Sequence, residues 1–130
     1  MAQSNKRAIG RLGEDAVCGF LERRGAEILC RNYTIRGGEM DIIARYDDIL
    51  LFVEVKTRQP DALQSGAAAV DRKKQQRMIR TAEHYLLSHG DTPLQTRFDV
   101  AEVEYAGGLV RRIRYLAGAF DASSGNGGTL

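Results

Sequence analysis

The 130-residue sequence has no tryptophan, two prolines, two cysteines and two histidines. Cys18 and Cys30 have neither zinc-ligand spacing nor a disulfide framework around them, so a zinc-binding or disulfide-stabilised domain is disfavoured. We expect both to be buried thiols. His84 and His89 have no further ligand at metal-binding spacing, and we expect both at the surface.

Long hydrophobic runs are also missing. No stretch approaches the roughly 20 apolar residues that span a bilayer, and residues 1–7 lack the apolar core of a signal peptide. We therefore expect a cytoplasmic protein that does not enter a membrane. The sequence contains no Ser-His-Asp order, phosphate-cradling glycine loop or Walker-type lysine, which argues against a serine hydrolase or an NTPase.

The composition is that of an ordinary globular protein, with 43% hydrophobic and 28% charged residues. A net charge of +2 is too small to identify a nucleic-acid-binding protein by itself. We expect one domain over residues 1–121 and a disordered Ser/Gly-rich tail over residues 122–130.

Hydrophobic periodicity predicts an α/β (α+β) fold with two helices and five strands. Helices are expected at about residues 5–24, ended by Gly25, and at about residues 68–88. The expected strands lie at residues 26–35, 39–46, 49–57, 97–105 and 109–116, of which the first three form an antiparallel meander.

The most informative feature is a hairpin predicted around the two-residue turn Asp47-Asp48. Counting outward from the turn, Asp41 stands opposite Glu54 on a non-hydrogen-bonded rung, where side chains approach most closely. Two like charges at this distance oppose folding unless a cation lies between them.

Strand alternation divides the hairpin into two faces, both partly apolar, so we expect both to be covered. Lys56 falls on the same face as the two carboxylates. The predicted faces are Met40, Ile42, Ala44, Leu51, Val53 and Val55 on one side, and Glu39, Asp41, Ile43, Phe52, Glu54 and Lys56 on the other.

Clustered carboxylates suit Mg²⁺ or Mn²⁺, which prefer oxygen ligands and need few of them from protein. We expect Asp41, Glu54 and the backbone carbonyl of Val55 as ligands, with Lys56 placed to orient an attacking water and to neutralise phosphate charge. Alternating charges can instead form a solvated face, Lys56 can pair with Glu39, and a bulge would break the register.

Glu14 lies on the margin of the apolar stripe of the first helix, a position that can point along the sheet towards the carboxylates. Taken alone, such a residue is more often a solvated one.

The second helix carries five cations within nine residues, Arg72 included. Solubility and phosphate binding explain its solvent-facing cations, Lys73, Arg77 and Arg80, equally well. Lys74 falls on the border beside Met78 and can reach sideways into a neighbouring site.

Several motifs, taken in order, resemble the YraN-like family of uncharacterised bacterial proteins over about residues 7 to 118. They are Gly13-Glu14, Asn32-Tyr33, Gly38-Glu39-Met40-Asp41-Ile42-Ile43, Phe52-Val53-Glu54-Val55-Lys56-Thr57-Arg58 and the segment around Lys74. The resemblance implies a restriction-endonuclease-like PD-(D/E)xK fold, an αβββαβ core whose central mixed sheet is flanked by helices, similar to archaeal Holliday-junction resolvases.

By this resemblance, Asp41 is the motif aspartate, and Glu54 and Lys56 form the E-x-K element. Glu14 is then the acid of helix one that approaches the metal through water, and Lys74 is a basic residue of the later helix. Met40 replaces the proline of the motif name, a change that touches no ligand.

We therefore expect a metal-dependent endonuclease acting on structured or branched DNA, with Lys73, Lys74, Arg77 and Arg80 binding the nucleic acid. A homodimer would provide two sites for symmetric cutting of two strands. The alternatives are a non-catalytic nucleic-acid-binding or scaffold protein on the same fold and an interaction domain with no nucleic-acid role.

Overall fold

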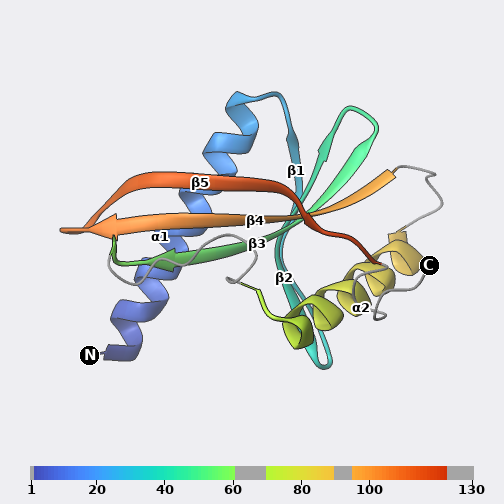
Figure 1. Ribbon diagram of the computed structural model, residues 1–130, viewed down its shortest axis with the longest axis horizontal. Helices are drawn as coiled ribbons and strands as arrows, with labels where there is room; N and C mark the ends of the chain where they lie inside the picture. Colours follow the sequence, from blue (N-terminus) through green and yellow to red (C-terminus); the bar gives the residue numbers. More distant parts are fainter. Residues whose placement is uncertain (1, 61–69, 90–94, 123–130) are drawn as a thin grey trace.

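The computed structural model describes residues 2–60, 70–89 and 95–122, which form a single mixed sheet with two helices (Figure 1). The elements are α1 (Ala2–Arg23), β1 (Glu27–Ile35), β2 (Gly38–Tyr46), β3 (Ile49–Arg58), α2 (Arg72–His89), β4 (Gln95–Ala106) and β5 (Leu109–Phe120). This arrangement confirms the predicted fold class and the αβββαβ order, with β5 added after the core.

The strands lie side by side in their order along the chain. β3 and β4 are parallel, whereas every other neighbouring pair is antiparallel. Parallel neighbours need a crossover, and α2 lies within it. Of the two helices in the described part of the chain, neither is long and apolar enough to cross a membrane.

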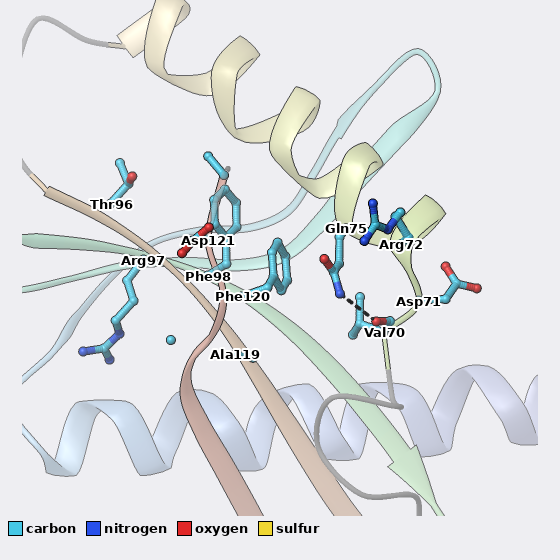
Figure 2. Close-up of a pocket in the computed structure, with 12 residues that line it drawn as sticks. Val70, Asp71, Arg72, Gln75, Thr96, Arg97, Phe98, Ala119, Phe120 and Asp121 are labelled. Carbon is cyan, nitrogen blue, oxygen red and sulfur yellow. Dashed lines mark hydrogen bonds between the residues drawn. The ribbon is translucent and has the colours of Figure 1, made fainter. Parts of the chain in front are cut away.

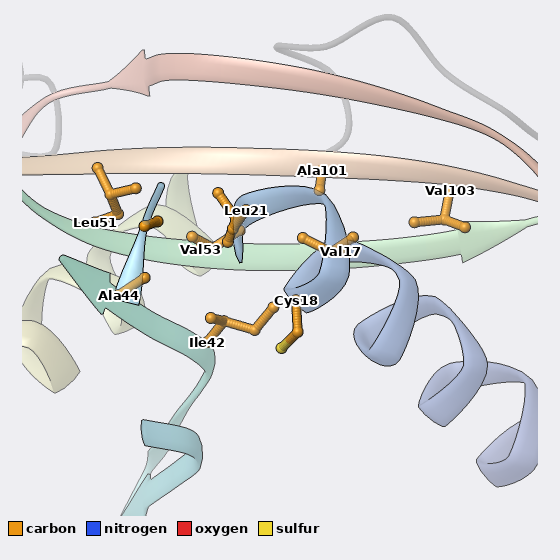
Figure 3. Packing of buried hydrophobic residues seen from close by; sticks show 10 residues of the cluster. Val17, Cys18, Leu21, Ile42, Ala44, Leu51, Val53, Ala101 and Val103 are labelled. Atoms are coloured by element: carbon orange, nitrogen blue, oxygen red, sulfur yellow. The ribbon is translucent and has the colours of Figure 1, made fainter. Parts of the chain in front are cut away.

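The two helices cover opposite faces of the sheet, so the prediction that both faces of the hairpin are covered is confirmed. Val17 and Leu21 of α1 pack on one face against Ile42, Leu51 and Val53 of the hairpin (Figure 3). On the other face, the α2 residues Met78, Ala82 and Tyr85 pack against a cluster that includes Ile43, Phe52 and Phe98.

The predicted hairpin register is confirmed over five pairs, from Tyr46↔Ile49 to Ile42↔Val53. The ladder ends there, one pair short of the predicted Asp41–Glu54 rung. Beyond this point β2 pairs only with β1, while β3 continues along β4 as far as Arg58. We call this divergence of β2 from β3 the fork; Figure 1 shows the two strands separating.

The fork corrects one prediction of strand alternation. Met40 was expected on the face of Ile42, but it is fully buried in the cluster on the α2 side. Freed from β3, the start of β2 turns towards α2, where a Cβ added to Gly38 would lie only 2.2 Å from the Thr81 Oγ1. At this point β2 has no partner on one side and twists, so simple strand alternation no longer predicts the face on which Met40 lies.

Element ends differ from the predictions by a few residues. α2 begins at Arg72, not near residue 68, because the Asp71 carboxylate accepts the Lys74 backbone N–H and caps the helix. Residues 68 and 69, and the expected tail beyond Ala122, lie outside the described residues. α1 ends as predicted before Gly25, whose φ of 93° is the left-handed conformation of a helix stop.

The surface positions of His84 and His89 are confirmed, as is the burial of Cys18. Cys30 was predicted to be buried and is only half-buried. It lies on β1, an edge strand of the sheet, just after a bulge between Ile28 and Cys30 that alters the pairing with β2.

A close contact between Gly13 and Thr57 fixes α1 on the sheet. A Cβ added to Gly13 would lie 1.9 Å from the Thr57 Oγ1 and 3.1 Å from its Cβ, so only glycine allows this approach. Thr57 is β-branched and therefore cannot easily move aside. The contact sets the position of the next helix residue, Glu14.

Exchanging two glycines of α1 for alanine tests this contact. Gly13→Ala should lower the free energy of unfolding by about 1–3 kcal/mol because it overpacks the interface. Gly10→Ala, at a position with nothing within 4 Å of the added Cβ, should raise it by up to about 1 kcal/mol through helix propensity. Urea denaturation of both variants is the measurement, and equal effects would contradict the proposed contact.

Candidate functional site

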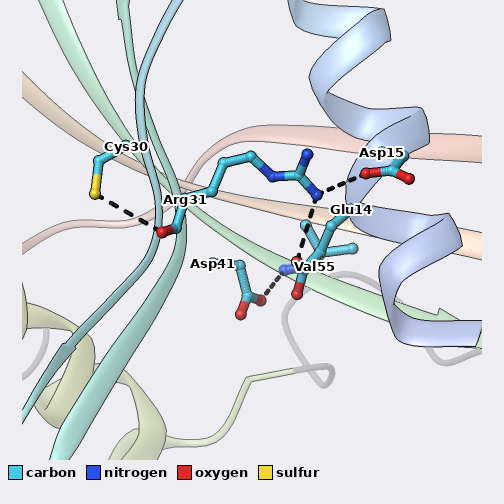
Figure 4. A network of polar contacts seen from close by, with 6 residues as sticks. All are labelled: Glu14, Asp15, Cys30, Arg31, Asp41 and Val55. Atoms are coloured by element: carbon cyan, nitrogen blue, oxygen red, sulfur yellow. Dashed lines mark hydrogen bonds and ion pairs between the residues drawn. The ribbon is translucent and has the colours of Figure 1, made fainter. Parts of the chain in front are cut away.

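Asp41 is the first residue of β2 beyond the fork, and its side chain takes over a backbone role. The Val55 N–H donates to the Asp41 Oδ2 at 2.7 Å (Figure 4). Had the ladder continued, Val55 would have formed the next hydrogen-bonded pair with Met40. The carboxylate therefore satisfies an amide that the departing strand leaves open.

Glu54, the next β3 residue after the last ladder pair, is almost completely buried beside two lysines. Its Oε2 lies 3.4 Å from the Lys56 Nζ and 3.3 Å from the Lys74 Nζ. Lys56 belongs to the same strand, whereas Lys74 comes from the first turn of α2. Within the described residues Lys56 therefore pairs with Glu54 and not with Glu39, the alternative partner.

Glu14 approaches the same region from α1. The Arg31 Nη2 lies 3.7 Å from the Glu14 Oε1 and 2.7 Å from the Asp15 Oδ1, so one β1 guanidinium bridges two acids of the helix (Figure 4). Burial raises the pKa of Glu14, and a hydrogen bond with Asn32 and the charge of Arg31 oppose that rise. Glu14 is thus a partly buried acid.

A cavity of about 410 Å³ brings the three acids together. Glu14, Asp41 and Glu54 line it with Val55 and Thr57, and Lys6 and Arg58 are among the cationic residues at its wall. The sequence-predicted catalytic acids therefore share one hollow at the fork, between the start of α1 and the end of β3.

The electrostatics of this hollow disfavour the charged form of Asp41, which, unlike Glu54, has no lysine beside it in the described residues. Burial raises the pKa of Asp41 from its ordinary 3.8 to about 7, and the negative charge of Glu54 acts in the same direction. The hydrogen bond from Val55 lowers the value, while Glu14 and Glu39 raise it further. An added cation would relieve this repulsion.

The available donors fit a cation that needs few protein ligands. The described residues contain no group of three or more His, Cys, Asp or Glu side chains arranged to hold a metal, which disfavours a closed structural zinc site there. Asp41 and Glu54 supply carboxylate oxygens. Since an extended strand directs the N–H and C=O of one residue to the same side, the Val55 carbonyl also faces the fork. Two carboxylates and one carbonyl suit Mg²⁺, which keeps several waters.

The basic residues of α2 divide into two groups. Lys73, Arg77 and Arg80 are exposed on its outer face, as expected, and do not line the acidic cavity. Lys74 alone of the four reaches the acids, through Glu54. The border position on the helical wheel had indicated this sideways reach.

Sequence reasoning missed several residues at the site, three of which are cations. Arg31 could not be placed opposite Glu14 because the β1 bulge shifts its register. Lys6 and Arg58 line the cavity. The only sequence signal for this is that Lys6 lies near the start of α1 and Arg58 at the end of β3, both close to the motifs. Strand alternation carries no signal for contacts made across the fork.

A second, larger cavity of about 840 Å³ lies between the start of α2 and the end of β5 (Figure 2). Phe98 and Phe120 stack in its wall, and Gln75 donates to the Val70 carbonyl at its edge. None of the predicted catalytic residues lines it. The three predicted acids line the smaller cavity instead, so we place the candidate chemistry there.

Comparison with known proteins agrees with the YraN-like resemblance. Residues 13–103 match the uncharacterised protein family UPF0102. A UPF0102 protein of Dictyoglomus thermophilum is 42% identical over 117 residues, covering 89% of this chain and 99% of that protein. A UPF0102 protein of Parafrankia sp. (strain EAN1pec) is 44% identical over 114 residues, covering 86% and 95% respectively. A third, from Nitrosomonas europaea, is 41% identical over 118 residues, covering 88% and 97%.

The raised pKa of Asp41 predicts how stability depends on pH in the absence of metal. The folded state holds this proton up to about pH 7 and the unfolded state only to about 3.8, so the free energy of unfolding falls as pH rises between those values. Asp41→Asn removes the titrating group. The free energy of unfolding of this variant should exceed that of wild type by on the order of 2–4 kcal/mol at pH 8, and the two should not differ below pH 3.5.

Urea denaturation in EDTA across this pH range measures the difference. Asp48→Asn, the same change at the exposed turn of the same hairpin, is the matched control and should follow wild type. A stability difference that does not vary with pH would contradict the assigned environment of Asp41.

Proposed function

The chain belongs to the uncharacterised protein family UPF0102, and we propose that it is a metal-dependent endonuclease that hydrolyses phosphodiester bonds in structured or branched DNA. The observation that carries the proposal is the acidic cavity at the fork, where Glu14, Asp41 and Glu54 converge beside Lys56. A basic helix lies on the other side of the same acids.

The acids that line the cavity and Lys56, which lies beside Glu54, each have a role in this chemistry. Asp41, Glu54 and the Val55 carbonyl would hold Mg²⁺ or Mn²⁺, which when bound would offset the charge that develops on the phosphate during in-line attack. Lys56 would orient the attacking water and neutralise a phosphate oxygen. Glu14, held by Arg31, would act through water at the edge of the site.

The exposed cations of α2 support nucleic acid as the substrate. Lys73, Arg77 and Arg80 present positive charge on one helix face, next to the turn that sends Lys74 to Glu54. Such a face binds phosphates without regard to base sequence. A homodimer would supply the second site needed to cut two strands.

One observation favours a second candidate, a non-catalytic nucleic-acid-binding protein. Glu54 is already neutralised by Lys56 and Lys74, so the acids tolerate folding without a metal. Salt-dependent DNA binding with no cleavage of linear or branched DNA in Mg²⁺ or Mn²⁺ would favour this candidate over the nuclease.

Removal of the Asp41 charge tests the nuclease proposal. Asp41→Asn should abolish cleavage of a four-way DNA junction and of linear duplex, while Asp48→Asn should cleave like wild type. Mg²⁺ should raise the melting temperature of wild type and Asp48→Asn but not of Asp41→Asn, because only a bound ligand stabilises the folded state. Cleavage that persists in purified Asp41→Asn would refute the assignment.

Replacing Lys56 separates catalysis from metal binding. Lys56→Met should reduce the cleavage rate by about 10²- to 10⁴-fold, the usual contribution of one positioned proton-transfer or charge-stabilising group. Stabilisation by Mg²⁺ should remain, since both carboxylates are retained. Loss of metal binding together with activity would show that Lys56 only supports the fold of the site.

A further inference from the structure

Two lysines compete for one oxygen of Glu54, and they differ in where they come from. Lys56 is two residues along the same strand, so its ammonium group stays near Glu54 whatever the helices do. Lys74 reaches the same Oε2 from α2, across the junction of two elements. The side chain of Glu54 is only 6% exposed, whereas that of Lys74 is 29% exposed.

The balance of charge implies that a bound divalent cation would displace one of these lysines from Glu54. Without a cation, Lys56 and Lys74 compensate Glu54 in a nearly closed environment, where an unpaired charge is costly. A divalent cation at Asp41 and Glu54 would repel both ammonium groups. The displaced lysine then needs another anion as a partner. Without one, its desolvated ammonium group would oppose cation binding.

Lys74 is the lysine able to find that anion. Its long stem can turn about the helix border towards solvent. It follows Lys73 directly and precedes Arg77 by less than one turn, so a phosphate held on the outer face of α2 lies within the reach of its side chain. The Asp71 cap holds the Lys74 backbone while the side chain moves.

We propose that Lys74 exchanges between Glu54 and a phosphate of the nucleic acid, so that nucleic-acid binding and divalent-cation binding at Asp41 and Glu54 strengthen one another. The inference rests on the proposed function and adds how its two ligands depend on each other. When Lys74 binds a phosphodiester, Asp41 and Glu54 become free to bind a cation. In the unliganded protein the ammonium group of Lys74 compensates the charge of Glu54 that a cation would otherwise compensate.

A static salt bridge that only fastens α2 to β3 is the competing interpretation. It predicts that losing Lys74 weakens the fold and leaves the relation between the two ligands unchanged. The exchange predicts the opposite pattern, because removing Lys74 deletes the group that links them. Affinities measured with each ligand, alone and together, distinguish the two.

The experiment measures the Kd of a fluorescein-labelled four-way DNA junction by anisotropy, in EDTA and in Ca²⁺, for wild type, Lys74→Met, Lys73→Met and Asp41→Asn. Ca²⁺ serves as the probe because it takes the same oxygen ligands. Isothermal titration of Ca²⁺ without DNA completes the set. Lys73→Met loses the same charge from the same helix turn without touching Glu54 and is the matched control.

In wild type, Ca²⁺ should tighten DNA binding by about fivefold or more, the usual lower range for coupled sites. Lys73→Met should weaken binding equally in both conditions and keep this ratio. Lys74→Met should bring the ratio close to that of Asp41→Asn and bind Ca²⁺ alone more tightly than wild type.

A wild-type ratio preserved in Lys74→Met would overturn the exchange and leave the nuclease proposal intact. So would Ca²⁺ affinity in Lys74→Met no higher than in Lys73→Met. A wild-type ratio of one would overturn the exchange, and a titration in which wild type binds Ca²⁺ no better than Asp41→Asn would overturn the metal-dependent function as well.

Discussion

The hydrogen bond from the Val55 amide to the Asp41 carboxylate is the contact on which the candidate site depends. It ends the β2–β3 ladder without leaving a buried amide unpaired, and so it permits the fork. The fork in turn opens the acidic cavity and turns Met40 towards α2. One side-chain acceptor thus replaces a backbone carbonyl of the neighbouring strand, and a cavity lies beside it.

The site draws on both layers of the protein. Glu14 comes from the helix on one face, Lys74 from the helix on the other, and Asp41 and Glu54 from the hairpin between them. A sheet normally keeps its two faces apart, but at the fork Glu14 and Lys74 both come near Glu54. Close approach of α1 at Gly13 then fixes how deeply Glu14 enters.

What the sequence could predict was local. The turn at Asp47-Asp48 determined the hairpin register, and the helical period with Gly25 located α1, because each depends on neighbouring residues. Asp41 and Glu54 were likewise found from register, whereas Glu14 was found from its place on the helical wheel together with the family resemblance. The early end of the ladder, the burial of Met40 and the position of Arg31 depend on twist, a bulge and contacts between distant segments, for which alternation carries no information.

The parallel pairing of β3 with β4 has a consequence for the order of assembly. Antiparallel β1, β2 and β3 join through short turns, whereas β4 can pair only after the crossover through α2 has closed. Because non-local contacts form slowly, we expect Asp41 and Glu54 to come together before Lys74 arrives. The chain then passes through a stage in which its acids repel one another, and a divalent ion in the surrounding solution can act on folding as well as on the finished protein.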